Sequence, residues 1–203
     1  MKIRTGFGGE NVITSYPQFV KYPKIPYAEE FPSIWNQEGY VFEKIDGSLS
    51  QVRNTKIGLV GGSKSNYLIG NRISFSNWFS RFLEWMRKNE SLTALPKEVI
   101  LFGEWLEPTT LDYGPDKLDK FYFIDLGFVN EGKPTFYDYD EACNYLKKWG
   151  IKDIEILDPI ARNVVFDPEL IRHTRNNQIS CLRDGGIEGV VLKNYRTQQF
   201  AKS

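Results

Sequence analysis

The chain has 203 residues, of which 41% are hydrophobic and 15% aromatic, and its 26 basic and 26 acidic residues give a formal net charge of +0. This size suits one domain with a substantial core, and we expect residues 1–203 to form that single domain. A protein that covers nucleic acid without sequence preference is usually more basic, so any such contact must rely on local patches. No apolar run reaches the length of a membrane span, which predicts no membrane partner.

The cysteines and the histidine exclude several kinds of site. Cys143 and Cys181 lack the spacing of metal ligands, and the N-terminal residues lack a secretory signal. We therefore expect reduced thiols in a cytoplasmic protein. His173 is the single histidine, which excludes any mechanism that needs two.

The N-terminal part of the chain predicts extended segments followed by a hairpin that contains Lys44. Residues 1–40 are irregular and contain four prolines, and residues 21–26 (KYPKIP) should be extended because residues before proline avoid helix. Residues 41–53 (VFEKIDGSLSQVR) form two strand-like runs joined by Asp-Gly, which predicts a tight hairpin. Strand alternation would place Lys44 and Asp46 on the same face.

Lys44 is the candidate nucleophile. A lysine two residues before an aspartate, beside a glycine that lets a ligand approach the backbone, suits covalent chemistry on a phosphate. Lysine is a poor nucleophile while protonated, but nearby cations or a pocket of low polarity lower its pKa. Taken alone, the four-residue pattern equally fits an exposed hairpin with a solvated lysine.

The elements that follow are mostly strands. Residues 57–60 should be a third strand, and the polar turn at 61–65 (GGSKS) is either an anion cradle or an ordinary loop. Ser76 should cap a helix that ends near residue 89. The apolar face of that helix comprises Phe79, Phe82, Leu83 and Met86.

The second half predicts more strands and two further helices. Strands are expected at 98–105, 120–128, 154–159 and 187–195, with a loop at 106–120 and a final run at 199–203. One helix is expected at 139–149, between Asp138 and Gly150, and another from Asp167-Pro168 to about residue 173. Asp125 is either a structural hydrogen-bonding residue or a site residue. In strand 187–195, Glu188, Val190 and Leu192 should share one face. The pattern predicts an α+β fold of antiparallel sheets flanked by helices.

Three carboxylates accompany the lysine, and each is next to a glycine: Asp46, Glu104 and Glu188. Three acids converging on one site would be unfavourable without a cation. That arrangement favours a hydrated Mg²⁺, which prefers oxygen ligands and keeps its waters. Lysines at both ends of the chain would balance a triphosphate.

Five segments resemble the motifs of one superfamily. EKIDGS (43–48), LFGEW (101–105), FYFIDL (121–126), IEGVVLK (187–193) and QFAKS (199–203) resemble motifs I, III, IIIa, IV and the start of V of the covalent nucleotidyltransferases, which include ATP-dependent ligases and mRNA capping enzymes. They occur in the family's order over about residues 20–203. KYPKIP, KIDGS and FAK are most similar to the RNA ligase 2 branch.

The resemblance implies a fold and a reaction. The fold would be a nucleotidyltransferase catalytic domain of the ATP-grasp-like ligase type, without an OB-fold. Lys44 would attack the α-phosphorus of ATP, release pyrophosphate and form lysyl-AMP. The AMP would pass to the 5′-phosphate of an RNA, and a 3′-hydroxyl would displace it and seal the strand. Mg²⁺, or Mn²⁺, would assist.

The resemblance also implies roles for individual residues. Those bordering the nucleotide would be Glu43, Ile45, Lys64, Glu104, Ile124 and Lys202, and those holding the metal, directly or through its waters, would be Asp46, Glu104 and Glu188. Relatives often have an aromatic residue at position 124, so the adenine stacks less well here or the strand register shifts. Relatives often carry arginine where this chain has Lys64.

Alternatives remain at this stage. A second lysine of motif V would follow Ser203, so either the chain is truncated or one lysine suffices, and a protein partner or a missing C-terminal segment would supply grip on RNA. Other readings are a DNA-nick ligase, a capping-type guanylyltransferase, or a catalytically inactive nucleotide- or RNA-binding module. The RNA itself could be a nicked duplex, a broken tRNA loop or single-stranded ends.

Overall fold

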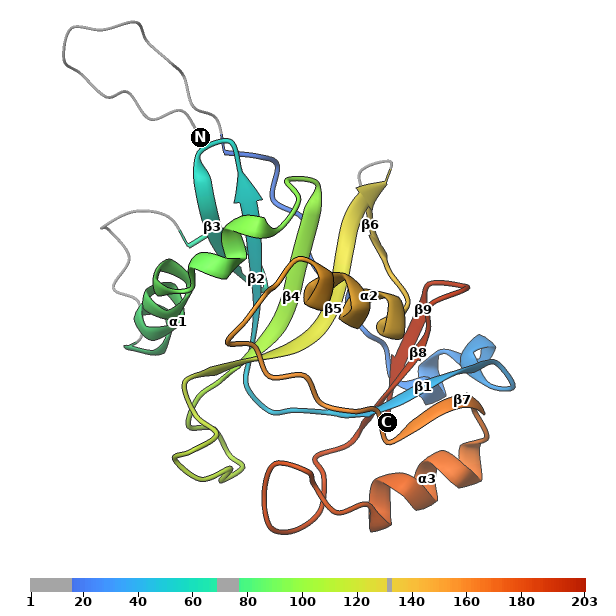
Figure 1. Cartoon of the computed structure of the whole chain (residues 1–203). Coiled ribbons are helices and arrows are strands. Elements are labelled where there is room, and N and C mark those ends of the chain that lie inside the picture. The colour runs from blue at the N-terminus through green and yellow to red at the C-terminus, as the bar shows by residue number, and fades with distance from the viewer. Residues whose placement is uncertain (1–15, 69–76, 131–132) are drawn as a thin grey trace, which may run out of the picture.

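The computed structural model describes residues 16–68, 77–130 and 133–203 and contains two antiparallel sheets (Figure 1). The four-stranded sheet has the order β7 (Ala161–Val165), β1 (Glu38–Glu43), β8 (Val190–Asn194) and β9 (Gln199–Lys202). The five-stranded sheet has the order β3 (Gly58–Ser63), β2 (Ser48–Thr55), β4 (Val99–Leu106), β5 (Lys120–Asn130) and β6 (Lys133–Phe136). The predicted α+β class is confirmed.

In the part of the chain that the structure describes, three helices flank the sheets: α1 (Asn77–Lys88), α2 (Tyr139–Lys148) and α3 (Pro168–Asn177). Short 3-10 helices lie at Ala28–Glu30, Pro32–Ile34 and Glu90–Ala94. Carboxylates begin two of the helices, because Asp138 accepts a hydrogen bond from Asp140 N and Asp167 accepts two from the first turn of α3. Both caps were predicted, although α3 runs four residues beyond residue 173. The predicted cap Ser76 lies outside the described residues.

The five-stranded sheet holds the larger core. Phe82, Leu83 and Met86 of α1 are buried as predicted, while Phe79 is partly buried. The Phe82 ring lies 5.6 Å from that of Trp105 on β4. Figure 1 shows α1 beside β3, α2 beside β5 and α3 below the four-stranded sheet. No helix in the described ranges combines the length and apolar character needed to cross a membrane.

The predicted hairpin at Asp46-Gly47 is wrong. β1 pairs with β7 and β8, whereas β2 pairs with β3 and β4, so residues 44–47 carry the chain from one sheet to the other. Asp-Gly favours a turn locally, but each strand finds its partners among residues far away in the sequence. Lys44 and Asp46 therefore do not share a strand face.

Three smaller expectations also differ. Residues 154–159 form no strand; Glu155 alone makes a parallel bridge, to Tyr122. Gly61 and Gly62 belong to β3, and only residues 64–66 bend. A Cβ on Gly61 would lie 2.9 Å from Leu83 Cδ2, so the lack of a side chain at this position allows α1 to pack closely against β3. The sequence did not predict β7, which has an exposed face and no clear alternation.

Candidate active site

A cavity of about 380 Å³ lies between the two sheets, within the usual range for small-molecule sites. Its walls come from β1, β8 and β9 of one sheet and from β2, β4 and β5 of the other. Seven residues predicted for catalysis or nucleotide contact line it: Glu43, Lys44, Ile45, Lys64, Glu104, Ile124 and Lys202. The structure thus brings together residues that are up to 159 positions apart, from Glu43 to Lys202.

Lys44 lies directly after β1, where its N–H donates to Gly189 O at 2.9 Å. Its ammonium forms an ion pair with the carboxylate of Glu188. The expectation that Glu188 shares a face with Val190 and Leu192 is wrong, because β8 begins only at Val190 and both apolar residues are buried in the core under α3. The irregular backbone before β8 lets Glu188 reach Lys44 instead.

The turn after Lys44 is held by a segment predicted only as a loop. The N–H of Asp46 donates to the hydroxyl of Tyr113 at 2.9 Å, and the hydroxyl of Thr109 donates to Asp46 O at 3.2 Å. A Cβ on Gly47 would lie 2.7 Å from Trp105 O, so only glycine brings this turn so close to β4.

Glu104 lies deep in the protein with part of its surface open to the cavity. Burial raises the pKa of its carboxyl to about 8; the charge of Lys44 opposes the shift, and the charges of Asp46 and Glu188 add to it. The three predicted metal-binding acids are therefore electrostatic neighbours.

Direct coordination of a metal by the three acids does not fit this arrangement. Within the described residues, no three histidine, cysteine, aspartate or glutamate side chains are grouped closely enough to hold an ion. Carboxylates that surround a site without meeting at one point suit a hydrated Mg²⁺, whose waters span the remaining distance.

Ile124 occupies a bulge. Phe102 pairs with Asp125, but the next residue of β4, Gly103, pairs with Phe123, so Ile124 is an extra residue on β5. A bulge changes the direction of side chains, and here both Phe123 and Ile124 line the cavity. Of the two outcomes foreseen at this position, the register shift occurs, and it supplies an aromatic wall.

Asp125 is a structural hydrogen-bonding residue beneath the cavity. Its carboxylate accepts hydrogen bonds from the hydroxyl of Tyr22, from that of Tyr195 at 2.7 Å and from Lys193 Nζ at 2.8 Å. Lys193 Nζ also donates to Ile124 O at 3.1 Å, which supports the bulge. Burial lowers the pKa of Lys193, and Asp125 opposes that change.

Lys193 lines the cavity, although the sequence did not predict it as a site residue. The available signal was a lysine that ends a run of apolar strand residues, since such a lysine is buried only with a partner.

The Glu43 side chain is hydrogen-bonded to the loop that contains Ser180 and Cys181. Its carboxylate accepts hydrogen bonds from the Ser180 hydroxyl and from Cys181 N at 3.0 Å, so it anchors the segment that leads to Glu188. Partial burial of its sulfur, followed by the hydrogen bond from Cys181 Sγ to Glu43 Oε2 at 3.1 Å and the charge of that carboxylate, raises the pKa of the Cys181 thiol to about 12.

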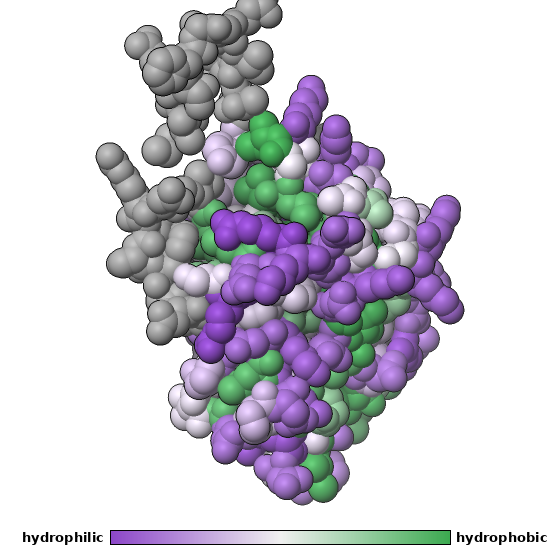
Figure 2. All heavy atoms as spheres, turned by 60° about the vertical axis from the view of Figure 1, so that its left-hand side comes forward, coloured by the Kyte–Doolittle hydropathy of each residue, from purple (hydrophilic) through white to green (hydrophobic). Residues whose placement is uncertain are grey.

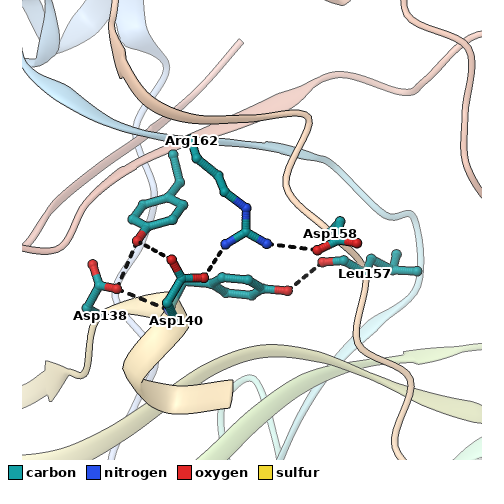
Figure 3. A network of polar contacts seen from close by, with 7 residues as sticks. Asp138, Asp140, Leu157, Asp158 and Arg162 are labelled. Atoms are coloured by element: carbon teal, nitrogen blue, oxygen red, sulfur yellow. Dashed lines mark hydrogen bonds and ion pairs between the residues drawn. The ribbon is translucent and has the colours of Figure 1, made fainter. Parts of the chain in front are cut away.

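Another wall is fixed by the network in Figure 3. Arg162 forms an ion pair with Asp140 on α2 and donates to Asp158 Oδ1 at 2.8 Å. The hydroxyl of Tyr139 donates to Leu157 O at 2.7 Å. Leu157 and Asp158 line the cavity, and their segment carried no motif that would have identified them.

Three further cationic residues line the cavity. Lys64 lies in the bend after β3, and Lys202 ends β9. Lys24 also lines the cavity, on the extended segment predicted from its prolines. Figure 2 shows that hydrophilic side chains cover most of the face on the α1 side, interrupted by hydrophobic patches.

Comparisons with known proteins agree with this architecture. The family model described as RNA ligase matches residues 37–203, and 36 chains of solved structures match. A Naegleria gruberi RNA ligase with PPi has a TM-score of 0.66 and 20% identity, over 99% of this chain and 60% of that one. A mutant of that ligase with ATP and Mn has a TM-score of 0.69 and 18% identity, over 93% of this chain and 56% of that one. The chain thus spans little more than half the length of these relatives, and a comparison with curated proteins finds no match.

Proposed function

Because the chain belongs to the RNA ligase family, we propose that it is an ATP-dependent RNA ligase whose Lys44 becomes covalently attached to AMP. The observation that carries the proposal is the position of the Lys44 amine in a cavity that also contains Glu104, Lys64 and Lys202. A nucleophilic amine, a buried acid and free cations are the groups that nucleotidyl transfer requires.

The reaction would proceed in three displacements at phosphorus. Lys44 Nζ, after losing a proton, attacks the α-phosphorus of ATP, forms a P–N bond and expels pyrophosphate. An oxygen of an RNA 5′-phosphate then attacks the same phosphorus, and Lys44 leaves. Finally a 3′-hydroxyl attacks the RNA phosphate, loses its proton and expels AMP, which leaves a phosphodiester.

The described residues suit separate parts of this chemistry. Phe123 and Ile124 give the cavity an apolar wall for a base, and the cations at the rim suit a triphosphate. The Lys44 ammonium forms an ion pair with Glu188, which holds the side chain in place in the cavity. A divalent ion held through water by Asp46, Glu104 and Glu188 would stabilise charge on the phosphate and lower the pKa of the lysine. Relatives with ATP and Mn support that cofactor choice.

Incubation with α-labelled ATP and Mg²⁺, followed by a denaturing gel, tests the proposal. Label should remain on the unaltered protein and on Lys147→Ala, an exposed residue of α2, and disappear in Lys44→Ala. If the unaltered protein takes up no label at any pH between 6 and 9, the ligase assignment fails.

The same assay, extended, separates the substrate classes. Labelling by GTP instead of ATP would indicate a capping-type enzyme. Nicked RNA and nicked DNA of the same sequence, each with a 5′-phosphate and a 3′-hydroxyl, would show which polynucleotide is sealed. Glu188→Ala should abolish most sealing while the circular dichroism spectrum stays unchanged, because Glu188 is exposed and outside the core.

A further inference from the structure

We propose that a separate cavity, at the end of β2 that is remote from Lys44, binds a backbone phosphate of the RNA strand, with Arg53, Lys56 and Lys97 as its ligands. This phosphate cavity has a volume of about 290 Å³, close to the lower limit for small-molecule sites. It shares no lining residue with the cavity that contains Lys44. The inference rests on the proposed function only where it names RNA as the source of the phosphate.

The phosphate cavity is cationic because of the way two strands pair. Arg53 lies in β2, Lys56 directly follows that strand, and Lys97 lies just before β4. Since β2 and β4 are antiparallel neighbours, the end of one lies beside the start of the other. The other described residues that line the cavity are uncharged: Pro17, Thr55 and Ile57. Three cations with no acid among the lining residues repel one another and favour a bound anion.

Arg53 is the residue that carries the inference. Its side chain is only 8% exposed, and Nη1 donates to two neutral oxygens, Gln18 O at 3.2 Å and Tyr67 Oη at 3.1 Å. Nε is buried and donates to no described residue, and no described carboxylate pairs with the guanidinium. A buried guanidinium without a counter-ion is unfavourable. The edge formed by Nε and Nη2 suits the two oxygens of a phosphate.

The turn that carries Lys56 has a fixed backbone. The hydroxyl of Thr55 donates to Gly58 O at 2.7 Å and accepts a hydrogen bond from the N–H of Ile57 at 3.2 Å. Lys56 and Lys97 are both exposed, and neither forms an ion pair within the described ranges. Their ammonium groups are therefore available to a ligand at the mouth of the cavity.

An RNA strand suits this cavity because it lies on the same face of the sheet as the nucleotide cavity. Leu49 lines the nucleotide cavity and Arg53 the phosphate cavity, and residues an even number of positions apart share a strand face. These two residues are roughly 13 Å apart along β2, which a short stretch of RNA spans. The strand would pass over residues 18–22, which cross β2 where Gln51 donates to Val20 O at 3.0 Å. Figure 1 shows β2 leading away from the four-stranded sheet, so the RNA would continue outward from Lys44.

Fluorescence anisotropy with a labelled single-stranded RNA tests the inference without any catalysis. Lys56→Ala/Lys97→Ala should bind about five- to tenfold more weakly, and the slope of log Kd against log salt should fall by about 0.7 for the lost phosphate contact. The loss should be equal for RNAs of different sequence, because a phosphate carries no sequence information. Lys147→Ala/Lys148→Ala, the same charge change at exposed positions of α2, should bind as the unaltered chain does. Equal losses in the two double variants, or no loss in the first, overturn the inference.

Arg53→Lys tests the buried ligand. It keeps the positive charge but loses the planar edge, so RNA affinity should fall about threefold or more. Because Arg53 also holds Gln18 and Tyr67, thermal melting is measured in parallel, and the exposed double variant decides the matter if Arg53→Lys does not fold. A folded Arg53→Lys variant with unchanged RNA affinity would overturn the assignment of Arg53 as a ligand.

A second arm identifies the source of the phosphate. In Lys56→Ala/Lys97→Ala, the RNA concentration for half-maximal sealing should rise as the Kd does, while self-labelling by ATP stays the same, since neither lysine lines the nucleotide cavity. Weaker self-labelling with unchanged RNA binding would assign the cavity to a free nucleotide or polyphosphate and overturn the inference. An unaltered chain that binds RNA as described but never takes label would refute the proposed function and leave the phosphate cavity standing.

Discussion

The buried contact between Lys193 and Asp125 joins the two sheets beneath the cavity. Lys193 belongs to β8 and Asp125 to β5, their charged atoms are 2.8 Å apart, and their side chains are 3% and 0% exposed. Lys193→Met and Asp125→Asn, made separately and together, would measure what this contact contributes to folding.

Removing either partner leaves a charge in the core. Lys193→Met leaves the Asp125 carboxylate with two tyrosine hydroxyls as donors, and Asp125→Asn leaves a buried ammonium opposite a neutral amide. Each change should lower the free energy of unfolding by about 3–5 kcal/mol, a large part of the roughly 5–15 kcal/mol of a typical domain. The double variant removes both charges, so its loss should be smaller than the sum by about 2 kcal/mol or more.

Urea unfolding followed by circular dichroism gives the free energies, provided that the slope with urea concentration stays constant. Lys88→Met is the control, because Lys88 pairs with Glu84 on the exposed surface of α1 and should change stability by less than about 1 kcal/mol. Single variants that lose under 1 kcal/mol, or losses that simply add, would refute the view that this pair joins the sheets.

Three further outcomes follow from the site. The pKa of Glu104 in the folded protein is about 8, above its ordinary value of 4.5. The ionised carboxylate is therefore less stable in the folded chain, and the free energy of unfolding falls as the pH rises from 4.5 to 8. With a chelator present, Glu104→Gln should be more stable than the unaltered chain at pH 8, by at most about 5 kcal/mol, and equally stable at pH 4. The Cys181 thiol, with its pKa raised to about 12, should be alkylated slowly by iodoacetamide at pH 8, and Glu43→Gln should speed the reaction about tenfold in a mass-spectrometric time course. A Cβ on Gly103 would overlap an aromatic ring and a carbonyl of β5, so Gly103→Ala should lower the free energy of unfolding by about 1–3 kcal/mol, whereas Gly186→Ala, whose nearest neighbour is 3.9 Å away, should leave thermal melting unchanged.

Local patterns predicted the elements whose stability is local. The helices begin at Asp138 and Asp167 because those carboxylates satisfy free N–H groups at a helix start. The long buried strand that contains Glu104 was readable from its unbroken apolar run. Five segments in family order identify the candidate site residues from the sequence alone.

Features that depend on distant partners were not predictable in this way. The Asp46-Gly47 turn has the composition of a hairpin, yet pairing with β8 and β4 directs its flanking strands into different sheets. The bulge at Ile124 depends on the register with β4. Lys24 lies in the KYPKIP segment, whose place beside the cavity depends on a distant contact, the hydrogen bond from Lys202 N–H to Pro26 O.

The passage of residues 44–47 between the sheets has a mechanical consequence. The chain also connects the sheets through residues 137–160, between β6 and β7, but residues 44–47 are the shorter connection. If the sheets rock relative to each other, this short connection is therefore the natural pivot of that motion. Displacement grows with distance from a pivot, so the lysines of the outer rim would travel farthest and the reactive amine least. The Lys44 amine, whose position relative to the nucleotide matters most, would therefore stay near the pivot while the entrance of the cavity widens and narrows.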